Sequence, residues 1–286
     1  MADSGRNSRE GYALLGPSLL VMALALAAPL LLMTLTSLKS QQGQGFAEGW
    51  TLAQYGAVLG RASYRDLFIR SVTISGLVTI ATVTLAYPMA YFVAFRAKRK
   101  FFWLVALTIP FWTSYLLRVF AWKIILGFDG LINSGLIRLH LISQPLGFLL
   151  YNPFAVVVTL AHAWAAFAIL PIYVSLEKID RSLLEAASDL GDGPVRRFLR
   201  ITLPLSLPGV IGAALLIFVP TTGDYVTPAL VGGTQGTMIA NLIEVQFNGV
   251  GNWPLGAALS LLSMAMVGVI AGLFVAGARA AGRYAR

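Results

Sequence analysis

Residues 154–176 read FAVVVTLAHAWAAFAILPIYVSL, an apolar run without one charged side chain. A helix needs about 20 predominantly apolar residues to cross the hydrocarbon core of a bilayer. A charged side chain at the bilayer centre costs at least ~2.5 kcal/mol on insertion scales, so a run of this length without charge predicts a transmembrane helix. An open strand is excluded, because its backbone polar groups would be unpaired in lipid.

The composition of the whole chain agrees with this prediction. The 286 residues are 57% hydrophobic and 12% charged, and the mean hydropathy is +0.76. Soluble domains carry about 45–50% apolar and about 25% charged residues, so a soluble globular fold is excluded. The chain has no cysteine, so neither a disulfide nor a thiolate metal site is expected.

Further charge-poor runs resemble the first one. They predict an all-α integral membrane protein with about six transmembrane helices, organised as a single domain over residues 1–286. The most N-terminal run, residues 13–38, contains Ala25-Leu26-Ala27, which resembles a signal-peptidase site. Its apolar stretch is longer than the core of a signal peptide, which favours a retained anchor. The predicted spans are residues 13–38, 71–95, 101–126, 154–176, 207–230 and 254–276.

Basic residues gather on alternate connecting segments. With a cytoplasmic N-terminus, residues 96–100 and 178–200 and both chain ends fall inside, and these segments hold most of the Lys and Arg. The positive-inside rule therefore predicts that both termini are cytoplasmic. The net charge of +9 then indicates membrane lipid as the neighbour of these segments, and not nucleic acid. The terminal basic residues are Arg6, Arg9, Arg279, Arg283 and Arg286.

The segment 177–207, between the predicted fourth and fifth spans, carries the strongest local pattern. SLLE at 182–185 matches a capping box, which predicts a short helix with Ser182 as its N-cap. Gly191 stands where a left-handed C-terminal cap is needed, and Pro194 predicts the start of a second helix. A helix-turn-helix at the inner membrane face follows. The prolines expected to end its second helix are Pro204 and Pro208.

In this segment the sequence resembles the permease subunits of ABC importers. Glu185-Ala186-Ala187, then Gly191, then ITLP at 201–204 have the spacing of the EAA motif of that family. The alternative is a surface helix with an incidental Glu-Ala-Ala. The resemblance implies the type I importer permease fold and a transporter subunit that is not an enzyme. It also implies a coupling helix docked on a cytoplasmic ATPase. The implied ATPase-coupling residues are Glu185, Ala186, Ala187 and Gly191.

The same resemblance implies the partners of this chain. No Lys follows a Gly, so the Gly-Lys step of a phosphate-binding P-loop is missing. ATP and Mg²⁺ would then be used by a separate subunit, and this chain would bind no cofactor. The implied partners are two ATPase subunits, a second permease subunit, identical or different, and an external solute-binding protein, all at a bacterial inner membrane.

Other segments resemble the spermidine/putrescine importer permeases. The resemblance implies a polyamine as the solute. Related permeases for opines, other organic cations, amino-acid derivatives or ferric iron share much of the pattern, so these solutes stay as alternatives. The segments are PFWTSYLLR at 110–118, LINS at 131–134, GDYVTP at 223–228 with Gly232-Gly233, and NWPLGAALS at 252–260.

Asp224 is the first candidate for contact with a cationic solute. It follows the charge-free residues 201–223, and a carboxylate at membrane depth usually faces a polar path. The alternative is an Asp that caps a broken helix end. For Arg118, snorkelling, pairing with Asp224 or attraction of an anionic solute are all compatible with its position late in the third span. The candidate path residues, including aromatic side chains that could form a cation-binding wall or simply pack, are Asp224, Tyr225, Trp112, Tyr115 and Arg118.

Two other function classes receive less support. A self-powered carrier needs its own ion-coupling groups at the midplane and commonly has a duplicated architecture. A membrane-embedded hydrolase needs paired carboxylates, a His cluster or a nucleophile with its base. The sequence shows neither set, and His162, alone between alanines in the fourth span, favours a hydrogen bond between helices over a proton relay.

Overall fold

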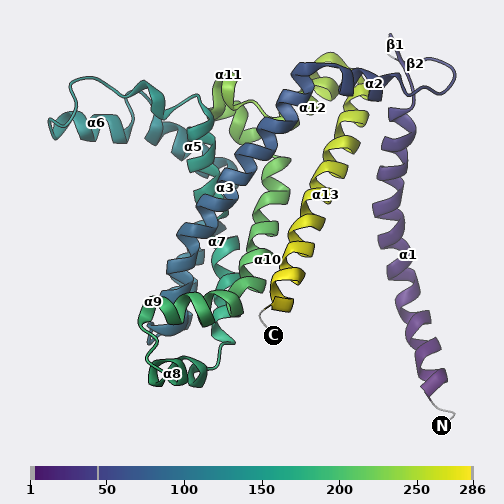
Figure 1. Cartoon of the computed structure of the whole chain (residues 1–286). Helices are drawn as coiled ribbons and strands as arrows, with labels where there is room; N and C mark the ends of the chain where they lie inside the picture. The colour runs from purple at the N-terminus through teal and green to yellow at the C-terminus, as the bar shows by residue number, and fades with distance from the viewer. Residues whose placement is uncertain (1–3, 44, 285–286) are drawn as a thin grey trace. The chain divides into compact units, whose positions relative to one another are not determined.

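The computed structural model describes the backbone of residues 4–43 and 45–284 and the side chains of residues 15–43 and 45–277. This part of the chain is almost entirely helical (Figure 1). A short antiparallel pair joins β1 (Gln41–Gln42) to β2 (Gly45–Phe46). The predicted cytoplasmic position of both termini stays a prediction. The terminal basic side chains that contribute to this prediction, Arg6, Arg9, Arg279, Arg283 and Arg286, lie outside the described side chains.

Among the described residues, five helices are long and apolar enough to cross a membrane, and a bent pair of helices makes up to six. This confirms the predicted all-α membrane protein with about six spans. The five are Leu15–Ser37 within α1 (Ser4–Ser37), α3 (Ala62–Phe95), α7 (Pro153–Glu177), Pro194–Thr222, and Trp253–Gly277 within α13 (Trp253–Tyr284).

The third predicted span, residues 101–126, is not a straight helix. Its two halves, Lys100–Trp112 and Tyr115–Arg138, are bent by 85°. Pro110 has no N–H to donate to the preceding turn, so the helix tightens into a 3-10 turn and then stops. The sequence predicts that Arg118 lies far along an unbroken span. The bend shows that this prediction is wrong. The elements are α4 (Lys100–Thr108), η1 (Ile109–Trp112), α5 (Tyr115–Leu126) and α6 (Leu131–Arg138).

The fifth predicted span, residues 207–230, is also displaced. One helical run extends from Pro194 to Thr222, so Pro204 and Pro208 do not end the second loop helix, contrary to the prediction. A wide π turn precedes Pro204, in which the Leu203 N–H bonds to the Phe198 carbonyl, and such local adjustments let membrane helices carry proline. The run consists of α9 (Pro194–Arg197), η3 (Phe198–Thr202) and α10 (Leu203–Thr222).

Contacts between Cα atoms divide the chain into two compact units. The first is Met1–Ala62 with Ile243–Leu262, and the second is Ser63–Leu242 with Ser263–Arg286. The single domain predicted over residues 1–286 stays a prediction.

The first unit joins short elements to the ends of two spans. The buried Ser37 at the end of α1 hydrogen-bonds through Oγ to the Tyr55 hydroxyl of α2 (Ala53–Gly60) at 2.7 Å. The Phe247 ring in η5 (Val245–Val250) packs edge-on against Trp253, with centroids 5.7 Å apart. Gly256 admits this ring, because a Cβ at that position would lie 3.0 Å from it.

In the second unit α7 and α10 pack closely against each other, and Figure 1 shows α3 running beside them. Gly209 marks the point of closest approach, since a Cβ there would lie 2.5 Å from the Pro171 carbonyl oxygen. Small residues let membrane helices approach in this way. Leu160, Ile172 and Ile217 are fully buried between these helices. The result is a tightly packed core that supports the loop at one end and broken helices at the other.

Candidate functional site

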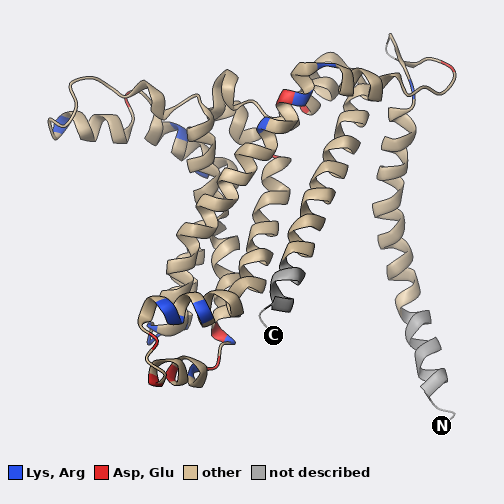
Figure 2. Ribbon diagram, viewed as in Figure 1, with Lys and Arg blue, Asp and Glu red and all other residues tan. Residues whose placement is uncertain are grey.

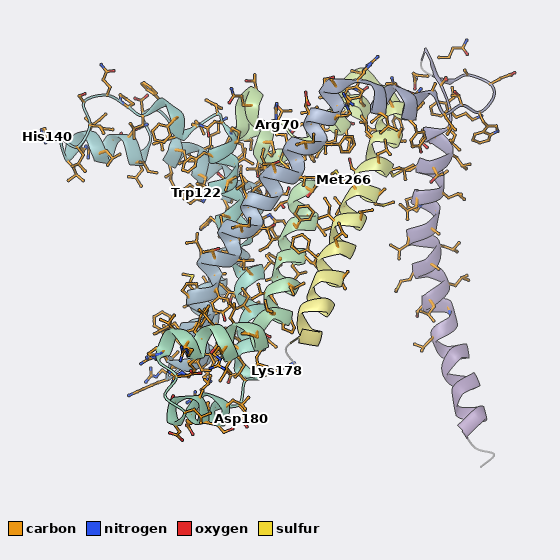
Figure 3. The ribbon with its side chains drawn as sticks, viewed as in Figure 1. Arg70, Trp122, His140, Lys178, Asp180 and Met266 are labelled. Atoms are coloured by element: carbon orange, nitrogen blue, oxygen red, sulfur yellow. The ribbon has the colours of Figure 1, made fainter. Side chains whose placement is uncertain are left out.

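The EAA loop, defined as residues 177–207, begins with the short helix α8 (Arg181–Asp189). Lys178 and Asp180, labelled in Figure 3, lie where α7 ends and α8 begins. Asp180 is the N-cap, and its carboxylate accepts a hydrogen bond from the Ser182 N–H at 2.9 Å. The predicted capping box with Ser182 as N-cap is therefore wrong, because the charged carboxylate two residues earlier takes that role. The same bond lowers the pKa of Asp180.

The helix α8 is terminated as the sequence predicts, with Gly191 directly after the C-cap Leu190. This glycine has a φ of +84°, which side chains with a Cβ rarely adopt. The Gly191 N–H bonds to the Ser188 carbonyl at 2.9 Å, and the Asp192 N–H bonds to the Ala187 carbonyl at 2.9 Å. These two bonds form a Schellman motif. Pro194 then occupies the first turn of the next helix, as predicted.

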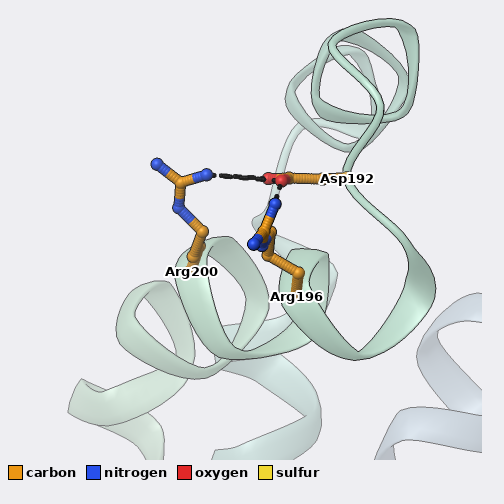
Figure 4. Close-up of polar contacts among 3 residues, drawn as sticks. All are labelled: Asp192, Arg196 and Arg200. Atoms are coloured by element: carbon orange, nitrogen blue, oxygen red, sulfur yellow. Dashed lines mark hydrogen bonds and ion pairs between the residues drawn. The ribbon is translucent and has the colours of Figure 1, made fainter.

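Charged side chains close the turn between the two helices (Figure 4). The Asp192 carboxylate lies 3.3 Å from Arg200 and 3.8 Å from Arg196. Arg197 also donates a hydrogen bond to the Ser188 hydroxyl of α8. The Asp192 side chain is 11% exposed, whereas the two arginines that pair with it are 68% and 67% exposed. Asp192 is therefore the hub that fixes α8 to the start of the membrane helix.

Most of α8 is uncovered by the described part of its own chain. Ala187 is buried, but Glu185 and Ala186 are exposed, and Leu190 is 87% exposed. Figure 2 shows charged residues gathered around α8 and α9. A hollow of about 540 Å³ is lined by Leu183 of α8 together with residues of α7 and α10. The loop thus presents a mixed apolar and charged surface instead of packing it away.

The loop is joined to α3 by an aromatic cluster that the sequence does not predict. The Phe198 ring lies 5.7 Å from the Tyr87 ring and 6.3 Å from the Tyr91 ring, both of α3. The Tyr87 hydroxyl hydrogen-bonds to Ser206 at 2.8 Å. Aromatic residues at helical spacing on a span are also expected in a cation-binding wall. The sequence alone therefore does not show that Tyr87 and Tyr91 pack against Phe198.

At the other end of the second unit lies a cavity of about 400 Å³, which we call the path cavity. It gathers three predicted path residues, Tyr115, Arg118 and Asp224, from elements far apart in the sequence. The remaining lining residues, which are not among the predicted path residues, complete an aromatic and apolar wall. They are Ala163, Trp164, Phe167 and Pro220.

Asp224 caps a helix end, which is one of the two roles considered for it, and its contact with a solute stays a prediction. Its Oδ2 accepts a hydrogen bond from the Tyr115 hydroxyl at 2.5 Å. Its Oδ1 accepts from the Val226 N–H at 2.9 Å and from the Thr227 N–H at 3.4 Å. The side chain therefore caps the helical segment that leads into η4 (Pro228–Gly232) and also lines the path cavity.

Arg118 is held by one carbonyl and two rings. Its Nη1 donates to the Ala163 carbonyl at 2.9 Å. Its guanidinium carbon lies 5.0 Å from the Phe111 ring centroid and 6.0 Å from the Tyr115 ring centroid. The ion pairs between described side chains do not include Arg118 with Asp224, so the pairing considered from the sequence is not found.

Two predicted path residues do not line the path cavity. Trp112 is 84% exposed and Tyr225 is 48% exposed. Trp112 is the last residue before the bend in the third span. Their contact with a solute stays a prediction.

His162 stacks on Phe111 with centroids 6.0 Å apart, and the described residues contain no cluster of His, Cys, Asp and Glu that could hold a metal ion.

Comparison with known proteins adds a family and a fold. Residues 17–281 match the family described as binding-protein-dependent transport system inner membrane component. The spermidine/putrescine transport system permease protein PotB of Escherichia coli (strain K12) is 36% identical, over 72% of this chain and 75% of its own length. PotB of Haemophilus influenzae is 34% identical over 82% of both chains.

Among solved structures, a bacterial ABC transporter involved in the import of the acidic polysaccharide alginate superposes with a TM-score of 0.73, covering 96% of both chains at 15% identity. At that identity the likeness shows the fold alone. It confirms the predicted importer-permease fold.

Proposed function

The chain belongs to the family of binding-protein-dependent transport system inner membrane components, and from this premise we propose that it forms the translocation path of an ABC importer for polyamines. It is a multi-pass inner membrane protein and a permease subunit. The observation that supports a polyamine as the solute is the 36% identity over 72% of the chain to a spermidine/putrescine permease.

The proposal includes partners that this chain lacks in itself. ATP with Mg²⁺ is used by two ATPase subunits, and this chain binds no cofactor. The missing Gly-Lys step of a P-loop supports this division. A second permease completes the path in the membrane lipid, and an external binding protein delivers the solute, as the family description supports.

The coupling we propose runs along one helix. An ATPase subunit binds α8 at the exposed Glu185 and Ala186, and Ala187 and Gly191 determine the shape of the docking surface. When α8 is displaced, the ion pairs of Asp192 transmit the movement to the helix Pro194–Thr222. This helix is 29 residues long, or about 43 Å at 1.5 Å per residue. The far end of that helix leads directly to Asp224 in the path cavity. The helix Pro194–Thr222 therefore connects the ATPase docking surface with the path cavity.

The path cavity suits a small organic cation. Asp224 supplies the carboxylate, while Tyr115, Trp164 and Phe167 supply ring faces that attract ammonium groups. Trp112 and Tyr225 would meet the solute outside this cavity. The presence of Arg118 in the lining favours a second candidate, a solute that also carries a carboxylate, such as an opine or another amino-acid derivative. Ferric iron has no comparable support among the described residues.

Uptake by the reconstituted complex tests the proposal. The chain is tagged in the cells that produce it, purified with whatever subunits accompany it, and placed in vesicles with its binding protein. We expect spermidine uptake that needs both ATP and the binding protein, and weak competition by an opine. Uptake without a nucleotide-hydrolysing subunit would contradict the importer role. Uptake of the opine alone would replace the polyamine by the second candidate.

A further inference from the structure

One ring of the path-cavity lining, Tyr115, is already in contact with a cation of the protein itself, and so is the neighbouring Phe111 ring outside the lining. The Arg118 guanidinium lies 5.0 Å from the Phe111 centroid and 6.0 Å from the Tyr115 centroid. These distances are those of cation–π contacts, which also hold organic ammonium ligands. A cationic solute that seeks the Tyr115 face therefore meets a group that already uses it.

The charge of the cavity lining is balanced before a solute arrives. Arg118 is the lining residue with a positive charge and Asp224 is the one with a negative charge. The Asp224 carboxylate also accepts hydrogen bonds from Tyr115, Val226 and Thr227, which leaves little free acceptor capacity. A di- or triamine entering the cavity would add positive charge that the lining does not neutralise.

A single hydrogen bond anchors the Arg118 guanidinium within the described part of the chain. The guanidinium Nη1 donates to the Ala163 carbonyl, and Nε is buried without a hydrogen-bond partner among the described residues. An unsatisfied buried donor adds a cost to this arrangement. Arg118 lies in the first turn of α5, directly after the bend in the third span.

We propose that Arg118 is a tethered competitor for the cation site: its guanidinium lies over the Tyr115 ring that lines the path cavity and is displaced from it by an ammonium group of the passing solute. This role rests on the proposed function, the import of an organic cation through the path cavity. Competition of this kind keeps the affinity of the path low, so that the solute is released and does not remain bound. Affinity is then supplied by the external binding protein, and the path serves passage.

The experiment compares charge removal at Arg118 with charge removal elsewhere on α5. Arg118→Gln is measured beside Lys123→Gln, which removes the same charge from the same helix outside the cavity lining. Binding of radiolabelled spermidine is measured on the purified complex without the binding protein, and uptake is measured in vesicles with it. We expect Arg118→Gln to lower the dissociation constant roughly threefold to tenfold and to reduce the maximal uptake rate. Lys123→Gln leaves both values unchanged.

A second variant keeps the test decisive if Arg118→Gln fails to assemble. Arg118→Lys retains the charge but lacks the planar group that stacks on rings, so a smaller shift in the same direction is expected. An unchanged or raised dissociation constant in both variants overturns the role of Arg118 while leaving polyamine import intact. If the wild-type complex neither binds nor imports spermidine, the proposed solute and the role of Arg118 both fail.

Discussion

The two ends of the helix Pro194–Thr222 are built in opposite ways. At the EAA loop, the shape is set by backbone geometry, a left-handed Gly191 and ion pairs to arginines that are about two-thirds exposed. At the path cavity, a single carboxylate is surrounded by rings, backbone amides and one guanidinium. The loop end keeps its shape and leaves its surface free, which suits docking on another subunit. At the cavity end the carboxylate of Asp224 is satisfied by donors of the protein, whereas the Arg118 Nε and Trp164 Nε1 donors are buried without a partner among the described residues, which suits a lining that rearranges when a solute passes.

The link between these ends should be the most sensitive point. In Gly209→Ala the added Cβ would lie 2.5 Å from the Pro171 carbonyl oxygen, so the α7–α10 crossing must open. Overpacking of this kind costs about 1–3 kcal/mol. We expect uptake to be lost and the melting temperature of the complex to fall. Gly212→Ala is the control, because a Cβ there meets nothing within 4 Å. Equal behaviour of the two variants would contradict the tight crossing.

Charge removal should affect the two ends unequally. Asp224→Asn keeps an acceptor for the helix cap but removes the charge from the path cavity, so spermidine uptake should fall about tenfold. Asp189→Asn makes the same chemical change on α8, outside the cavity, and should leave spermidine selectivity unchanged. Initial uptake rates over a range of spermidine concentrations measure both. Unchanged uptake in Asp224→Asn would remove Asp224 from the path.

The Asp192 hub should show a smaller effect that appears in coupling. Asp192→Ala removes the partner of Arg196 and Arg200, and exposed ion pairs contribute about 0.2–1 kcal/mol each. We expect roughly threefold less solute imported per ATP hydrolysed, since α8 is held less firmly. Vesicle assays of uptake and ATP hydrolysis give this ratio. Wild-type stoichiometry would show that the Schellman turn alone fixes the loop.

The smallest effect should be an acid sensitivity confined to the loop end. The bond from the Ser182 N–H lowers the pKa of Asp180 below its usual 3.8. Because the folded pKa is the lower one, the stabilisation of α8 is present above the unfolded pKa and is lost as pH falls through the folded pKa. Hydrogen exchange of the Ser182 amide, corrected for its intrinsic pH dependence, should lose protection in that acidic range. Asp180→Asn should abolish this pH dependence, and a wild-type amide protected equally at all pH values would contradict it.

Local patterns sufficed wherever a residue type has one strong backbone preference. Gly191 and Pro194 are found in the predicted positions, and the runs 71–95, 154–176 and 254–276 each lie within one helix. Patterns failed where two residues compete for one role. Asp180 and Ser182 are both good N-caps, and the sequence does not decide between them. Proline is equally ambiguous in membranes, where Pro110 precedes a bend but Pro204 and Pro208 lie inside a helix.

The path cavity could be predicted only in part. Asp224, Tyr115 and Arg118 attract attention as polar or aromatic residues in apolar surroundings. That they meet depends on the bend in the third span and on the end of α10 at Thr222, both of which are tertiary features. Phe167 and Ala163 carry no local pattern that separates them from ordinary core residues of α7.

The central claim is that movement of the EAA loop reaches the path cavity through one helix. The chain lacks cysteine, so in Tyr225→Cys, directly after Asp224, a maleimide labels one position of this chain, and its label is read in the gel band of this chain after reaction of the reconstituted complex. We predict that trapping the ATPases with vanadate changes the labelling rate at least threefold, and that Gly191→Trp in the loop removes this change. A labelling rate that is the same with and without trapping, in vesicles that still import the solute, would contradict the claim.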